Sequence, residues 1–327
     1  MRRVSKATVS TAPAGRTASR CARYAESLKS SSSLFVPVRG LRYHVRSWGD
    51  AEAPKLFMHH GWMDVGASFQ FLIDELKREW HVIAPDWRGF GLSQWSDDGY
   101  WFADYIADLD ALLDHFAPGE KVLLVGHSLG GNVVMLYAGI RAQRVGGVVS
   151  LEGFGIPAEE PDIAAQKFVK WLDALKSPPA FRPYRDLDAV ADQLQRNSPR
   201  LSRDKAQFLA SHWASVAADG TARLNSDPRH KLPFPTVYRM EEVLAIWKRI
   251  TSPVLWVAAT ESFIPKWLGA HPEGEAATDS LASIRARLDN VPNARFATIA
   301  DAGHMLHLDR PDAVAEVIEA FLAEPRR

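Results

Sequence analysis

Residues Gly126–Gly131 have the sequence Gly-His-Ser-Leu-Gly-Gly and fit the pattern G-x-S-x-G around Ser128. The apolar run Val122–Val125 comes directly before the motif and predicts a strand, and Asn132–Ala138 follows it with helical spacing. This strand–turn–helix context is the one in which G-x-S-x-G presents a nucleophile. Small residues are needed on both sides of the serine because a Cβ would collide on so sharp a turn. The start of the following helix also points backbone N–H groups toward Ser128.

Outward from this motif, the chain alternates short apolar runs with amphipathic segments. Apolar strands interleaved with helices predict an α/β fold whose mostly parallel sheet is covered on both faces. The predicted strands are Leu34–Val38 and Leu41–Trp48 as a hairpin, Lys55–His59, Val82–Pro85, Lys121–Val125, Val145–Leu151, Val254–Ala258 and Arg295–Ile299. The predicted helices include Ala67–Glu79, Trp101–Phe116 and Pro311–Ala323.

Residues 156–249 interrupt this alternation. Prolines divide the segment into helical pieces, among them Ile163–Leu175 and Arg203–Ala217, and the pattern predicts no strand there. We therefore expect a core made of residues 34–155 and 250–327, with residues 156–249 inserted as a helical cap.

The first 33 residues differ from the rest in composition. They contain seven basic residues and one acidic residue and are rich in Ser, Ala and Thr. Such a segment buries too little apolar surface to offset chain entropy, so residues 1–33 are predicted to form a disordered basic tail. The same composition fits an organelle transit peptide. The protein is expected in the cytoplasm, with organelle targeting as the alternative.

Overall composition narrows the function classes. The chain has 327 residues with 39 basic and 39 acidic side chains, so its formal net charge is zero. This balance argues against a nucleic-acid binder held by phosphate contacts. Cys21 is the sole cysteine, which excludes an internal disulfide framework and Cys-cluster metal sites. The sequence contains no run of 18 apolar residues, so no membrane span is predicted. The oligomeric state stays open, a homodimer included.

Three further motifs accompany the Ser128 motif. Together, in this order, they resemble the α/β-hydrolase fold family across residues 34–322. They are His60-Gly61-Trp62 after a strand, Asp86–Ser93 after the next strand, and Asp301–His307 before the last helix. In this family these loops supply an oxyanion loop, a loop after the fourth strand and the catalytic histidine. The resemblance implies a doubly covered sheet with an inserted cap.

The resemblance also implies roles for single residues. Ser128 matches the nucleophile, and His304 matches the general base that takes its proton. The backbone N–H groups of Leu129 and Trp62 match the oxyanion hole. Trp62 follows the glycine of the oxyanion loop, and His127 comes directly before Ser128. Both are expected at the substrate pocket, where His127 also fits a structural role. The mechanism requires no metal and no cofactor.

Two carboxylates compete for the third catalytic position. The family's usual acid, an aspartate, falls in register near Ser262, and Glu261 lies one residue earlier. Glu152 follows the predicted strand that ends at Leu151, a place where some relatives carry the acid. The stretch Leu224–Arg229 resembles serine hydrolase-like proteins, a branch that we associate with this earlier position. Glu152 is therefore the preferred candidate and Glu261 the alternative.

The predicted function is hydrolysis of a small to medium acyl compound, with a carboxylic ester as the favoured bond. Epoxide hydrolases and haloalkane dehalogenases share the fold but use an aspartate where this chain has Ser128. Two alternatives stay open: a C–C bond hydrolase of a diketone-type substrate, and a non-catalytic binding protein on the same fold.

Overall fold

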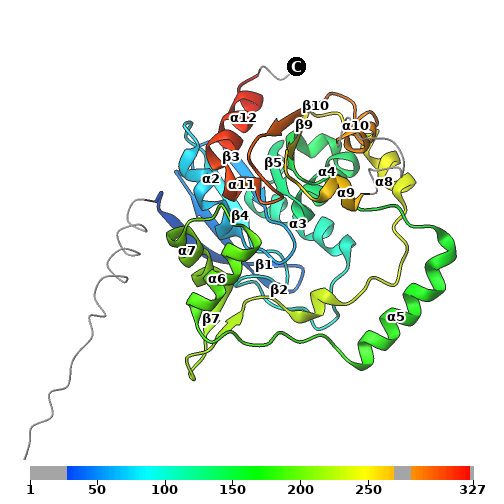
Figure 1. The fold of residues 1–327 in the computed structure, drawn as a ribbon. Coiled ribbons are helices and arrows are strands. Elements are labelled where there is room, and N and C mark those ends of the chain that lie inside the picture. Colours follow the sequence, from blue (N-terminus) through cyan, green and yellow to red (C-terminus); the bar gives the residue numbers. More distant parts are fainter. Residues whose placement is uncertain (1–27, 269–280, 325–327) are drawn as a thin grey trace, which may run out of the picture.

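The computed structural model describes residues 28–268 and 281–324, and its centre is an eight-stranded sheet (Figure 1). The strands lie in the order β1-β2-β4-β3-β5-β6-β9-β10. Their bounds are β1 Ser31–Val38, β2 Leu41–Trp48, β3 Lys55–His59, β4 His81–Pro85, β5 Val122–His127, β6 Val145–Leu151, β9 Val254–Ala259 and β10 Ala294–Ile299. Each strand predicted from the sequence is present within a few residues of its predicted bounds.

The sheet is mostly parallel, as predicted. The β1–β2 and β2–β4 pairs are antiparallel, and the pairs from β4 through β3, β5, β6 and β9 to β10 are parallel. Strand β1 begins at Ser31, because Ser31–Ser33 pair with Arg46–Trp48. The predicted tail boundary after residue 33 is therefore too late by these three residues, and residues 1–27 of the tail lie outside the described part.

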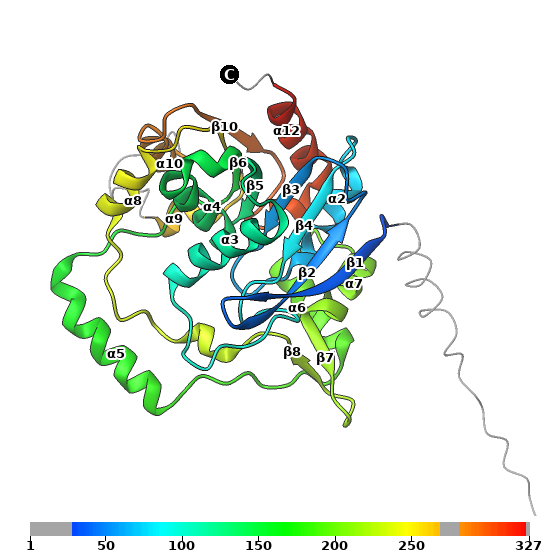
Figure 2. The same cartoon turned by 180° about the vertical axis from the view of Figure 1, so that it is seen from behind.

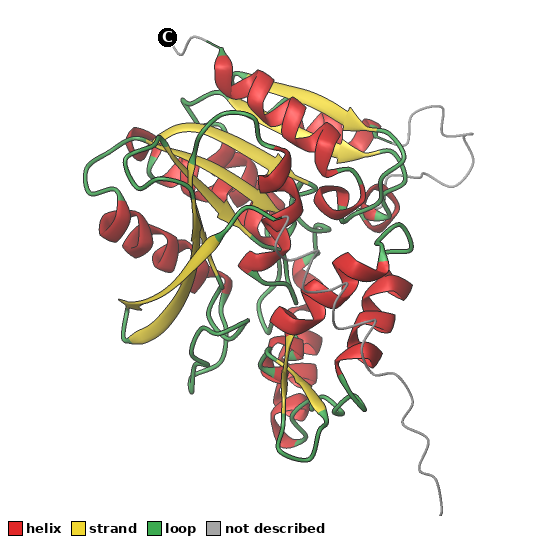
Figure 3. Ribbon diagram, turned by 90° about the vertical axis from the view of Figure 1, so that its left-hand side faces the viewer, coloured by secondary structure: helices red, strands yellow, loops and turns green. Residues whose placement is uncertain are grey.

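Helices cover both faces of the sheet, as Figures 2 and 3 show. One apolar core lies between the sheet and α3 (Phe102–Phe116), α4 (Leu129–Ile140) and α8 (Met240–Trp247). The other lies between the sheet and α2 (Gln70–Glu75) and α12 (Pro311–Ala323). Burial of apolar surface on both faces explains why the strands show no polar alternation. Short helices α9 (Ile264–Trp267), α10 (Ala282–Leu288) and α11 (Leu306–Asp309) complete the C-terminal part.

The segment between β6 and β9 forms a separate layer with its own apolar cluster. Before α8 it contains α5 (Ala164–Lys176), α6 (Leu187–Asn197), α7 (Arg203–Trp213) and a two-stranded sheet of β7 (Ala214–Val216) and β8 (Ala222–Leu224). Helix α5 stands apart from α6 and α7 (Figure 1), and its side chains are not buried.

Three local predictions are wrong. The insertion does contain strands, and the helix predicted to reach Ala217 ends at Trp213. The reason is the Asp219-Gly220 pair: Gly220 has a φ of +82°, which glycine adopts without steric cost, and the chain reverses there into a hairpin. The helix predicted over Ala67–Glu79 is also shorter, because Leu76 is extended and caps α2 at Glu75.

None of the helices in the described ranges is long and apolar enough to cross a membrane.

Candidate active site

Ser128 lies on a strained turn between β5 and α4. Its φ is +52°, a conformation rare for residues other than glycine, and its N–H donates to Leu151 O at 2.8 Å. The neighbouring glycines allow this turn. A Cβ on Gly126 would come within 2.3 Å of Gly130 O, and one on Gly130 within 2.1 Å of His59 O. The small residues of the motif are therefore required by contact with backbone.

His304 reaches Ser128 from the loop between β10 and α11. Its Nε2 lies 3.1 Å from Ser128 Oγ, and its Nδ1 lies 3.2 Å from Glu152 Oε2. The three side chains thus form a continuous hydrogen-bonded row, although their loops are 176 and 152 residues apart along the chain. This is the arrangement of a nucleophile, a base and a group that orients the base.

Glu152 is buried and held by β9 and the loop that follows. It leaves the end of β6 with a φ of +57°. Ala259 N–H donates to its Oε1 at 2.7 Å, and the Ser262 hydroxyl donates to its Oε2. The structure places Glu261 elsewhere: its carboxylate pairs with Arg200 at the surface. Of the two candidate acids, Glu152 is the one beside His304.

Two backbone segments lie next to Ser128, the start of α4 and the loop after β3. Leu129 begins α4, so its N–H is among those that have no acceptor within the helix. Gly61 passes so close that a Cβ there would lie 3.2 Å from Ser128 Cβ. His60 fixes this loop, since its Nε2 accepts from Trp87 N–H at 2.8 Å and its Nδ1 lies 2.8 Å from Gly61 O. Burial lowers the pKa of His60 to about 4, so its ring is neutral at pH 7.

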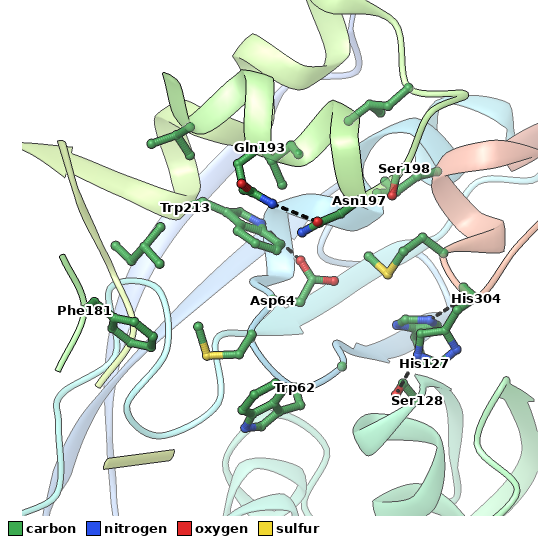
Figure 4. Close-up of a pocket in the computed structure, with 18 of the residues that line it drawn as sticks. Trp62, Asp64, His127, Ser128, Phe181, Gln193, Asn197, Ser198, Trp213 and His304 are labelled. Atoms are coloured by element: carbon green, nitrogen blue, oxygen red, sulfur yellow. Dashed lines mark hydrogen bonds between the residues drawn. The ribbon is translucent and has the colours of Figure 1, made fainter. Parts of the chain in front are cut away.

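A cavity of about 440 Å³ opens above Ser128, at the carboxyl ends of β3 and β5. Ligands of α/β proteins commonly bind at this edge. Figure 4 shows Ser128 and His304 at one end and Phe181 at the other, with Trp62 and Trp213 between them. The walls are mostly apolar, and many come from the insertion: Phe181, Tyr184, Val190, Gln193, Leu194, Asn197, Ser198, Leu201, Trp213, Leu224 and Lys231.

The two predicted substrate residues both line this cavity but differ in exposure. Trp62 is 50% exposed, whereas His127 is buried and its Nε2–H donates to His304 O at 2.8 Å. His127 therefore also supports the His304 loop. The sequence reasoning missed Asp64, which lines the cavity, and Ser262, which holds Glu152. The signal for Ser262 was its position in the register of the usual acid.

Comparison with known proteins identifies the family of the chain. The family model described as alpha/beta hydrolase fold matches residues 54–311, and the chain belongs to this family. A serine hydrolase-like protein of Danio rerio is 26% identical over 302 residues, covering 90% of this chain and 89% of the relative. Serine hydrolase-like protein 2 of Homo sapiens is 21% identical over 290 residues, covering 85% and 89%. The chain thus lies on the serine hydrolase-like branch of the family.

Solved structures share the fold. The thioesterase domain from the curacin biosynthetic pathway superposes with a TM-score of 0.75 at 23% identity, over 89% of this chain and 99% of that domain. At this identity the likeness establishes the fold alone. The family, its named relatives and the fold identify the chain as a hydrolase of the α/β type.

Proposed function

We propose that the chain is a serine hydrolase in which Ser128 is the nucleophile, His304 the general base and Glu152 the acid that orients it. The observation that carries the proposal is the hydrogen-bonded row from Ser128 Oγ through His304 to Glu152, located at the end of an apolar cavity. A retired site on this fold has no reason to retain three side chains from three loops in hydrogen-bond contact.

The hydrogen-bonded side chains of Ser128, His304 and Glu152 suit acyl transfer through a covalent intermediate. Ser128 Oγ attacks the carbonyl carbon while His304 Nε2 takes the hydroxyl proton. The tetrahedral intermediate collapses, the bond to the leaving alcohol breaks, and the alkoxide takes the proton from His304. A water molecule then attacks the acyl-enzyme by the same steps, releasing the acid and restoring Ser128. Glu152 stabilises the imidazolium that forms twice in each cycle.

The N–H groups of Leu129 and Trp62 are the proposed oxyanion hole. One begins α4 and the other follows Gly61, the residue that runs past Ser128. Backbone donors in this position are fixed before the reaction, so they stabilise developing negative charge without reorganisation. Removing one such donor in other enzymes costs about 3–4 kcal/mol of transition-state stabilisation.

The substrate class follows from the cavity. A volume of about 440 Å³ with mostly apolar walls suits a small to medium acyl group. Among the described lining residues, Lys231 is the one Lys or Arg, and aromatic and aliphatic groups dominate the rest. A neutral ester therefore suits this space better than a polyanionic substrate. We assign residues 156–249 as the cap, because they supply half of the walls.

The test is hydrolysis of short- and medium-chain nitrophenyl esters by wild type and by Ser128→Ala. We expect turnover by the wild type and a loss of about three or more orders of magnitude in the variant. A fluorophosphonate should label the wild type and not the variant. Equal turnover by both proteins would show that the nucleophile lies elsewhere. Absence of both turnover and labelling in the wild type would favour a binding protein.

A size series tests the cavity. Leu224 lies on β8 and lines the cavity, whereas Val216 on the paired strand β7 is exposed. Leu224→Trp should lower kcat/KM for an octanoate ester at least tenfold more than for an acetate ester. Val216→Trp, the matched control on the same hairpin, should leave kcat/KM for both esters unchanged. An unchanged chain-length preference in Leu224→Trp would contradict the assignment of this cavity to the acyl group.

A further inference from the structure

Behind the row of Ser128 and His304 lies a second cluster of buried polar side chains. Asp64, His127 and His307 each offer one ligand atom, and these atoms all lie within 4.8 Å of one another. The residues come from the loop after β3, the end of β5 and helix α11. All three are buried, and His307 is 0% exposed. The proposed reaction uses neither Asp64 nor His307.

The two imidazoles are held with unused nitrogens. Within the described residues, both ring nitrogens of His307 and Nδ1 of His127 have no hydrogen-bond partner. The Nε2–H of His127 donates to His304 O, which leaves a lone pair on Nδ1. An unsatisfied buried nitrogen of this kind is costly and calls for a partner.

Asp64 supplies the third ligand from its carboxyl group. Its Oδ1 accepts from Val65 N–H at 2.8 Å and Trp213 Nε1–H at 3.2 Å, and its Oδ2 accepts from Ser68 Oγ at 2.8 Å. Oδ2 also faces His307 Nε2 at 3.9 Å. A carboxyl group whose orientation is fixed by neighbouring donors has the outer-shell support of protein metal ligands.

The cluster also has access to the cavity. Asp64 and His127 line the cavity, so an ion can arrive from solvent and keep its fourth position open toward the substrate side. Bonds of about 2.0–2.2 Å in a tetrahedral site require the ligand atoms to approach one another by roughly 1 Å. Binding therefore requires small rotations of these three side chains.

We propose that Asp64, His127 and His307 bind one divalent transition-metal ion, and that the bound ion inhibits hydrolysis. Two nitrogen ligands and one carboxylate oxygen match Zn²⁺ and its neighbours rather than Mg²⁺ or Ca²⁺. Inhibition follows from position. Asp64 and His127 line the same cavity as Ser128, so an ion held between them narrows the space beside the nucleophile. The inhibitory half of this proposal rests on the proposed function; the binding half does not.

The binding test uses Zn²⁺ in equilibrium dialysis against the full chain carrying Ser128→Ala, so that no turnover is involved. We expect one Zn²⁺ per chain and a visible absorption spectrum of tetrahedral type when Co²⁺ replaces it. His307→Gln and Asp64→Asn, two independent variants, should each weaken Zn²⁺ binding at least tenfold. His115→Gln, which changes an exposed histidine on α3, is the matched control and should bind Zn²⁺ as the parent does. Melting curves establish that each variant is folded.

The outcomes separate the two halves. No stoichiometric Zn²⁺ on the parent, or full binding by both His307→Gln and Asp64→Asn, overturns the site. Loss of binding in His115→Gln alone moves the ion to the surface and overturns it as well. In chains with Ser128 intact, Zn²⁺ should lower kcat/KM at least tenfold, with much of this loss removed in Asp64→Asn. Binding without inhibition overturns only the inhibitory half, and binding to a chain with no esterase activity refutes the proposed function while the metal site stands.

Discussion

Replacing Glu152 by Gln tests whether the carboxylate of Glu152 is the acid that orients His304. The amide has one oxygen and one NH₂ group where the carboxylate has two acceptors, yet three groups face that carboxylate: Ala259 N–H, the Ser262 hydroxyl and His304 Nδ1. If the amide oxygen stays on Ala259 N–H, its NH₂ faces His304 Nδ1. The imidazole then carries its proton on Nε2 and cannot accept the proton of Ser128.

The magnitude can be worked out for both amide orientations. The opposite orientation serves His304 but turns the NH₂ toward Ala259 N–H, a buried donor–donor contact that costs about 1–3 kcal/mol. Either orientation also loses the negative charge 3.2 Å from the imidazolium. At an effective dielectric constant of about 20 this charge contributes roughly 5 kcal/mol. We therefore expect kcat/KM to fall by about three to four orders of magnitude, comparable to the loss in a serine protease triad.

The assay compares ester hydrolysis by wild type, Glu152→Gln and Glu261→Gln. The last variant is the matched control, because Glu261 pairs with Arg200 at the surface and should retain wild-type kcat/KM. Fluorophosphonate labelling of Ser128 should be slower in Glu152→Gln, the variant that loses turnover, and unchanged in Glu261→Gln. If Glu152→Gln is folded by its melting curve and keeps kcat/KM within fivefold of wild type, the reasoning on the acid is refuted. A loss in Glu261→Gln alone would transfer the role to Glu261.

Three further predictions address the loop, the core and the pH dependence. Gly61→Ala puts a Cβ 2.9 Å from the buried His127 Nδ1 and 3.2 Å from Ser128 Cβ, so ester hydrolysis should show a kcat/KM lowered about 10- to 100-fold by displacement of the loop, and the melting temperature should fall as well. Arg88→Met removes the guanidinium whose Nε lies 2.5 Å from buried Asp108, so the free energy of unfolding in urea should fall by about 3 kcal/mol. The double variant Arg88→Met with Asp108→Leu should recover part of this loss. Burial lowers the pKa of His59 to about 3. Its contribution to the unfolding free energy is therefore complete above pH 6.5 and is lost at about 1.4 kcal/mol per pH unit as the pH falls below 6.5. His59→Phe should move the acid-unfolding midpoint to lower pH, and an unmoved midpoint would show that other groups govern acid unfolding.

Hydrophobic patterning and short motifs were enough to predict the fold. Strands buried on both faces are marked by continuous apolar runs, and a glycine-lined turn such as that around Ser128 has few other uses. The hairpin of β7 and β8 was missed for a physical reason. Its strands are three residues each and lie in a helical insertion, so their periodicity is too short to detect. The Asp219-Gly220 turn was the available signal.

The cavity could not be predicted in the same way. Its walls join residues of the core loops to residues of α6, α7 and β8, which are distant in sequence and meet only through packing of the insertion. Asp64 illustrates the limit. In the sequence it is a loop carboxylate, whereas in the structure it is buried with His127 and His307. Neither spacing nor composition carries that information.

The choice of acid shows what a sequence register can and cannot decide. Strands β6 and β9 are parallel neighbours, with Leu151 paired to Val257, so both strands end at the same edge of the sheet. Glu152 leaves β6, but its carboxylate accepts from Ala259 N–H at the end of β9. The side chain therefore spans the gap between the strands and delivers its charge to the place where an acid on the β9 loop would lie. There Ser262 supplies a hydroxyl donor in place of a second carboxylate. Glutamate rather than aspartate suits this route because the extra methylene supplies the reach, and the two acid positions of the fold converge on one location for the charge.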